Sequence, residues 1–131
     1  MPMIPAISIA ASGLAAASAR LQASASNIAN QASRGAPGGG APKAYTPVNV
    51  VQTAQPGAGV SARIQPAATP PVIEYDPDAP FADAEGRVAS PAIDIARQFV
   101  DQMLSQRAFE ANLKVIRSAD EMTRSLIDRS A

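Results

Sequence analysis

An apolar repeat near the C-terminal end constrains the fold more than any other feature of this sequence. Between residues 100 and 126, apolar residues recur at intervals of four and three, and the spacing repeats every eleven residues. Such a period keeps one stripe on the same side of a nearly straight α-helix. We therefore predict a helix over 91–129, with Ser90 as its N-cap and Pro91 at its first position. This apolar seam is the predicted assembly interface of the helix, and it consists of Val100, Leu104, Ala108, Ala111, Val115, Ala119, Met122 and Leu126.

The same segment carries a second apolar stripe that lies off this seam. It is formed by Ile95, Phe99, Met103, Phe109, Leu113, Ile116 and Ile127. A helix with two apolar faces needs two sets of neighbours.

The N-terminal segment has a heptad pattern over residues 5–31. Its large residues stand seven apart, and small residues such as Ala10, Ala17 and Ser24 fill the intermediate core positions. Gly13 in the helix interior favours a close contact with a partner helix, because glycine there otherwise costs about 1 kcal/mol. The predicted assembly-interface residues of this helix are Ile7, Leu14, Leu21 and Ile28.

The middle of the chain has a very different composition. Residues 31–91 contain 10 of the 12 prolines and 7 of the 8 glycines, which is typical of irregular chain. Short β-prone runs at 44–52, 59–65 and 71–75 interrupt it, so either a small β element or an extended wrap is expected.

Together these patterns predict a mainly α fold. Long N- and C-terminal helices would pack as a coiled-coil-like hairpin, joined by a Pro/Gly-rich middle segment with a small β hairpin or extended loop. The predicted divisions are 1–31, 32–90 and 91–131. One hairpin cannot cover every apolar stripe, so the remainder is expected to face other subunits, and heterologous contacts that do not close give a helical filament or tube.

The composition excludes much chemistry. The chain has no histidine and no cysteine, so it lacks an imidazole base, a thiolate nucleophile and the usual zinc ligands. We expect no enzyme activity, no catalytic residue, no cofactor and no metal site. Residues 1–73 hold four basic residues and no acid, whereas 74–131 hold eleven acids and seven bases. This asymmetry favours association between copies over nucleic-acid binding, which needs a dense basic surface.

The apolar N-terminus resembles a signal peptide only superficially, because it has no positive charge before Arg20. No run of about 20 strongly apolar residues follows, so no membrane insertion and no signal cleavage are expected.

An acidic stretch at 75–86 is the remaining candidate site. It begins like a calcium-binding loop, but proline and phenylalanine stand where the EF-hand pattern needs an oxygen ligand and a glycine. Calcium binding, a glycosidase-like carboxylate pair and a simple acidic turn are the alternatives. The carboxylates are Asp76, Asp78, Asp83 and Glu85.

Three segments resemble the axial proteins of the bacterial flagellum, and within them the small proximal-rod proteins of the FlgC type. The N-terminal helix carries the Ser12-Gly13-Leu14 element and an Ala-Ser-Asn-Ile-Ala-Asn element that contains Asn27 and Asn30. The stretch YDPDAPFADAEGRV resembles the sequence before the C-terminal helix in this type. The C-terminal helix carries the motif residues Arg107, Phe109, Glu110 and Asn112.

The resemblance implies a structural subunit of the flagellar basal-body rod, assembled through its terminal helices into a tubular drive shaft for motility. Its partners would be copies of itself, other rod proteins and the flagellar type III export apparatus. It would be exported without a cleaved signal peptide to the rod that crosses the periplasm. The alternative is a free helical-hairpin binding module or an export chaperone.

Overall fold

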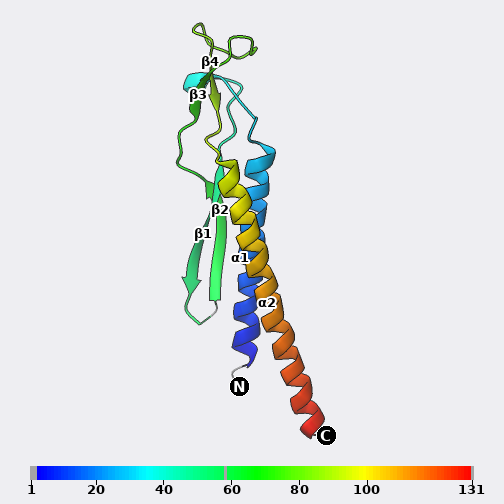
Figure 1. The fold of residues 1–131 in the computed structure, drawn as a ribbon. Coiled ribbons are helices and arrows are strands. Elements are labelled where there is room, and N and C mark those ends of the chain that lie inside the picture. Colours follow the sequence, from blue (N-terminus) through cyan, green and yellow to red (C-terminus); the bar gives the residue numbers. More distant parts are fainter. Residues whose placement is uncertain (1–2, 58, 131) are drawn as a thin grey trace.

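The computed structural model describes residues 3–57 and 59–130, which form an elongated molecule (Figure 1). In chain order its elements are α1 (Met3–Ala29), the short 3₁₀ helix η1 (Pro37–Gly39), the strands β1 (Val48–Gln55), β2 (Gly59–Pro66), β3 (Val72–Tyr75) and β4 (Arg87–Ser90), and α2 (Ile95–Ser130). No described helix is both long enough and apolar enough to cross a membrane.

The predicted mainly α fold is wrong, because the chain has a mixed α and β fold with about 20% strand. The middle segment forms two separate antiparallel sheets, β1–β2 and β3–β4, in place of a Pro/Gly-rich connection. Two glycines of this segment, Gly57 and Gly86, stand in the turns that join the paired strands, and both have a φ of 72°. The residues that flank each of these turns form the strands.

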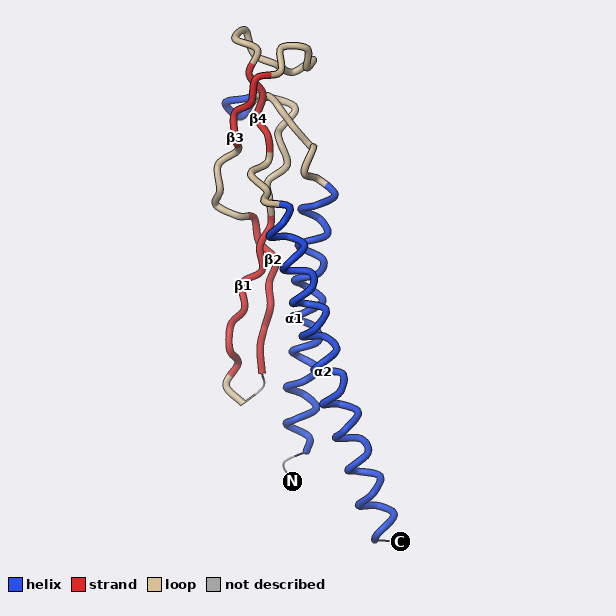
Figure 2. The backbone as a smooth tube through the Cα atoms, viewed as in Figure 1, coloured by secondary structure: helices blue, strands red, loops and turns tan. Residues whose placement is uncertain are grey.

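α1 lies between the β1–β2 hairpin and α2. Figures 1 and 2 show the hairpin on one side of α1 and α2 on the other, running antiparallel to α1. On the hairpin side, the Ser12 hydroxyl accepts a hydrogen bond from the Val60 amide at 3.0 Å. On the α2 side, Arg20 pairs with Asp101 at 3.8 Å. The C-terminal end of α2 extends past the N-terminal end of α1 (Figure 1).

α2 begins later than the sequence patterns predict. Asp94 caps it, because its Oδ1 atom accepts a hydrogen bond from the Arg97 amide at 3.1 Å. Ser90, the expected N-cap, ends β4 instead and donates its hydroxyl to Glu74 at 2.8 Å.

The core contains few large side chains. Among the described residues, five alanines of the helices are buried, together with Val88 and Ala89 of β4 and the two prolines Pro47 and Pro91. Ser24, Asn27, Ser90 and Ser105 are buried polar residues. An alanine buries little apolar area, so this core contributes little hydrophobic free energy to folding. Most of the larger apolar side chains stay partly exposed in the single chain and do not add to it.

Candidate assembly surfaces

The face of α2 that packs on α1 is small and polar. Ser105 is completely buried, and its hydroxyl donates a hydrogen bond to the Asp101 carbonyl at 2.6 Å. A Cβ atom on Gly13 would stand 2.5 Å from the Asn112 Oδ1 atom, so the helices approach closely where Gly13 has no side chain. We call this face the inner line, and its members stand seven residues apart: Gln98, Ser105, Asn112 and Ala119.

Most of the predicted C-terminal seam lies on the open side of α2. Its large members are between 47% and 58% exposed, and Ala111 is also exposed. Two predicted members lie elsewhere, because Ala108 is half-buried and Ala119 is buried on the inner line. We call the exposed members the outer stripe: Val100, Leu104, Ala111, Val115, Met122 and Leu126.

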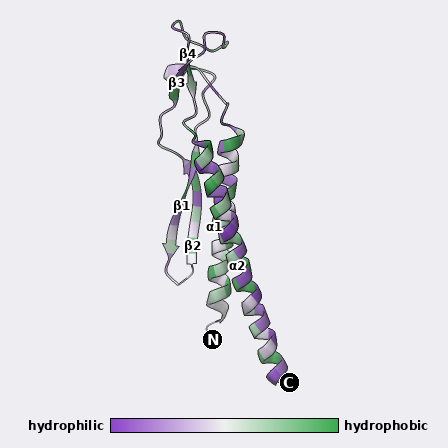
Figure 3. Ribbon diagram, in the orientation of Figure 1, coloured by the Kyte–Doolittle hydropathy of each residue, from purple (hydrophilic) through white to green (hydrophobic). Residues whose placement is uncertain are grey.

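The second apolar stripe of α2 divides along its length. Phe99, Met103 and Ile127 are exposed, whereas the remaining members are half-buried: Ile95, Phe109, Leu113 and Ile116. Figure 3 accordingly shows apolar segments recurring along the whole of α2, including its far end.

The predicted contact residues of α1 lie along the margin of its open face. Ile7 is 37% exposed, whereas Leu14, Leu21 and Ile28 are half-buried. The open face beside them consists mostly of small exposed residues, among them Ala11, Ser18 and Ala25, together with the exposed Gln22.

Several motif residues are used inside the subunit. Ser12 bonds to β2, and Gly13 meets Asn112, whose side chain also donates to the Ala108 carbonyl at 2.8 Å. Asn30 directly follows the last residue of α1, and its side chain donates to the Ser26 carbonyl at 2.9 Å. The other members of the C-terminal motif lie further out, because Arg107 and Glu110 are exposed and Phe109 is half-buried.

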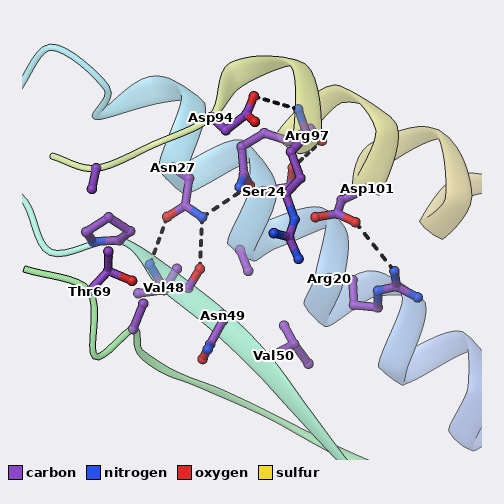
Figure 4. Close-up of a pocket in the computed structure, with 15 residues that line it drawn as sticks. Arg20, Ser24, Asn27, Val48, Asn49, Val50, Thr69, Asp94, Arg97 and Asp101 are labelled. Carbon is purple, nitrogen blue, oxygen red and sulfur yellow. Dashed lines mark hydrogen bonds and ion pairs between the residues drawn. The ribbon is translucent and has the colours of Figure 1, made fainter.

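Asn27 joins three parts of the fold (Figure 4). Its side-chain amide exchanges two hydrogen bonds, each of 2.8 Å, with the amide and carbonyl of Val48 at the start of β1. It also donates to Gln98 Oε1 at 3.2 Å and accepts from the Tyr45 hydroxyl at 3.1 Å. Ser24 donates to the Gln98 carbonyl at 2.7 Å. We call these five residues the Asn27 cluster.

The Asn27 cluster borders a half-open cavity of about 510 Å³ between α1, α2 and β1. Arg20, Arg97, Asp94 and Asp101 bring two positive and two negative side chains to it. The cavity therefore has balanced charge. From the sequence, Asn27 was only a motif residue without an assigned partner, although its seven-residue spacing from Arg20 and Gly13 placed it on the face that meets α2.

The acidic stretch forms the tip beyond β3–β4 and is largely neutralised by arginines. Arg34 pairs with Glu74 at 3.1 Å and with Asp76 at 3.2 Å. Arg87 pairs with Asp83 at 2.8 Å and with Glu85 at 3.2 Å. Within the described residues, no three acidic side chains come together as metal ligands, so the calcium hypothesis gains no support.

Hydrogen bonding to Asp83 holds the tip loop together. Its Oδ1 atom accepts the backbone amides of Arg87 at 2.7 Å and Glu85 at 3.1 Å. The backbone hydrogen bond from Arg87, followed by the contact with its guanidinium group, lowers the pKa of Asp83 below its ordinary value of 3.8.

Comparison with known proteins gives one consistent result. Residues 84–129 match the family model described as the C-terminal region of flagellar basal-body rod FlgEFG proteins. The flagellar basal-body rod protein FlgC of Salmonella typhimurium is 35% identical over 125 residues, which cover 93% of each chain. The FlgC protein of Agrobacterium fabrum is 33% identical over 97% of this chain and 94% of its own. That of Aquifex aeolicus is 30% identical over 99% and 96%.

Proposed function

This chain belongs to the FlgC family of flagellar basal-body rod proteins, and we propose that its outer stripe and the open face of α1 are the surfaces through which it assembles. It is a structural subunit of the proximal rod and not an enzyme. The alternative of a free helical-hairpin module or export chaperone is not favoured by its relatives.

The exposed apolar surface carries the proposal. The outer stripe places five large apolar residues, each about half exposed, along one side of α2. A monomeric soluble protein rarely leaves so continuous an apolar surface open unless another molecule covers it. A stripe of large side chains is complementary in shape to the open face of α1, where Ala11, Ser18 and Ala25 leave room for a second helix.

The two surfaces differ from one another, so the contact they make is heterologous. α2 of one subunit would lie against α1 of the next, and repetition without closure gives a tube. Similar helices in other rod proteins could replace either partner. The basic first part of the chain and its acidic second part would guide the order of neighbours, although salt screens exposed charges beyond about 8 Å.

Export and location complete the proposal. The resemblance implies passage through the flagellar type III export apparatus without signal cleavage, followed by assembly in the part of the rod that crosses the periplasm. A chain whose core is mostly alanine loses little packing free energy when it is unfolded for export, and it regains order when partners cover its stripes.

Complementation tests this proposal. The chain is expressed in a strain from which its gene has been deleted, and basal bodies are purified and analysed by mass spectrometry. We expect the full-length chain, with its N-terminus uncleaved, in the purified rods, together with restored motility. A stable soluble monomer bound to another unassembled axial protein, and absent from the rods, would instead support the chaperone function.

A further inference from the structure

We propose that Asn27 is a positioning residue that fixes the β1–β2 hairpin to both helices, so that the hairpin keeps one orientation in the assembled subunit. This inference rests on the proposed function in one respect only, which is that its test uses the chain assembled in purified basal bodies.

The side-chain amide of Asn27 is bonded as a neighbouring β-strand would be. Val48 lies opposite Pro66 in the β1–β2 register, next to the position where the Ala67 amide donates to the Pro47 carbonyl at 2.7 Å, so the amide and carbonyl of Val48 point away from β2. On this free side of β1 both groups meet Asn27, with both distances 2.8 Å. Asn27 is 3% exposed, so water cannot replace these partners without opening the contact.

The remaining hydrogen bonds of the same amide reach two other elements. An asparagine side chain can donate twice and accept twice, and Asn27 uses all four possibilities. Its third and fourth hydrogen bonds join it to Gln98 on α2 and to Tyr45 in the loop before β1. One side chain of α1 therefore holds β1, the loop before it and α2 at a single point.

A second side-chain contact holds the other end of the hairpin. The Ser12 hydroxyl accepts from the Val60 amide at 3.0 Å and donates to the Ile9 carbonyl at 2.7 Å. Residues 12 and 27 lie about 22 Å apart along a helix that rises 1.5 Å per residue. An isolated two-stranded hairpin is only marginally stable, so its order depends on such anchoring.

Hydrogen–deuterium exchange of the full chain in purified basal bodies tests the role of Asn27. In Asn27→Ala, we expect the β1–β2 amides to exchange at least about tenfold faster than in the wild type. The β3–β4 amides belong to the other sheet and should keep their wild-type rates, which a general loss of stability would not allow. Asn30→Ala is the matched control, because Asn30 belongs to the same motif but bonds only to Ser26 and Ser33.

Tyr45→Phe provides a milder variant that keeps the test decisive if Asn27→Ala does not enter the rod. It removes the hydroxyl that donates to Asn27 and shares a 3.0 Å hydrogen bond with Ser26. We expect exchange in the hairpin to rise about two- to fivefold. Unchanged hairpin exchange in this variant, or equal acceleration in both sheets, overturns the inference.

Two further outcomes separate this inference from the proposed function. If Asn30→Ala raises the amide exchange rates of the hairpin as much as Asn27→Ala does, the cause is a disturbance of the end of α1, and the proposed role of Asn27 is rejected. If the wild-type chain is absent from basal bodies, the proposed rod function fails, and the same exchange comparison on the isolated chain decides the role of Asn27.

Discussion

The two faces of α2 invert the usual arrangement of an amphipathic helix. The two α2 residues that are buried, Ser105 and Ala119, are small, whereas a stripe of large apolar side chains on another side of the helix is exposed. In most globular proteins the large apolar residues of a helix are the ones that face the core. Here the contact within the subunit uses the inner line, and the outer stripe stays open.

This difference indicates where the folding free energy is realised. Full burial of a valine, leucine or methionine contributes about 1.5 to 3 kcal/mol relative to exposure. The five large residues of the outer stripe gain only part of this in the single chain, because each is about half exposed. The rest becomes available when another helix covers them, which couples order to assembly.

A charge on the outer stripe gives the largest expected effect. We expect Leu104→Asp to abolish motility and incorporation into the rod while the protein remains soluble and exported. The reason is that an unpaired carboxylate in a packed interface costs several kcal/mol. Motility in soft agar and immunoblots of purified basal bodies measure the result, and Leu14→Asp at the margin of the α1 face should behave in the same way.

Two controls show whether position on α2 or charge alone is responsible. Gln106→Asp introduces the same charge on an exposed side of α2 that lies about 160° from Leu104, if each residue turns the helix by about 100°. Asp78→Ala removes an exposed carboxylate at the tip. Both substitutions should have little effect on motility. If the Leu104→Asp strain were motile and the Asp78→Ala strain were not, the acidic tip and not the outer stripe would be the surface required for assembly.

Crowding of the inner face has the second largest expected effect. Gly13→Ala places a Cβ atom 2.5 Å from Asn112 Oδ1, which displaces that side chain and its hydrogen bond to Ala108. We expect a cost of about 1 to 3 kcal/mol, as for other overpacked contacts. It would be measured as reduced incorporation at raised growth temperature. Asn112→Ala in the same chain should restore much of the loss, whereas additive losses would show that the two residues do not interact.

The sequence predicted both helices because their apolar periods are long and regular. It did not reveal which stripe faces the partner within the chain. Large residues such as Leu104 indicated an assembly interface and left the contact within the chain unassigned. Gly13 and the alanines of α1 allow so close an approach that small and polar residues of α2, such as Ser105 and Asn112, fit between the helices. The correct signal was the seven-residue spacing of Gln98, Ser105, Asn112 and Ala119.

The strands were harder to predict, because the overall composition of the middle segment is typical of irregular chain although its glycines in turns still allow strands to form. Proline and glycine dominate the middle segment, yet Gly57 and Gly86 stand in the turns and leave the strands intact. β4 is only four residues long, and its place depends on pairing with β3 and on the two hydrogen bonds, 2.9 and 2.8 Å, between Gly35 and Ala89. Such contacts between distant residues leave no local pattern.

A crosslink between subunits gives a third test with little expected effect on function. The chain has no cysteine, so introduced thiols are the sole ones. Ala17 would be a poor site because it is 3% exposed, whereas Ala11 and Ala111 are exposed on the open faces of α1 and α2. With cysteine at both positions, we expect oxidised rods to yield multimers of this chain. Products confined to a single chain would contradict the arrangement.

The smallest expected effect belongs to the tip, which takes no part in either face of α2. Because the folded-state pKa of Asp83 lies below the ordinary value of 3.8, its contribution is fully present above pH 3.8 and disappears as the pH falls through the lowered pKa. Acid should therefore release the amides of Glu85 and Arg87, which both donate to Asp83, and their exchange can be followed by NMR. Asp83→Asn should weaken the loop at neutral pH and remove this acid transition. The outer stripe contains no titratable group, so packing along it should persist over the same pH range, and a simultaneous loss of subunit association would show that the tip and the stripe are coupled.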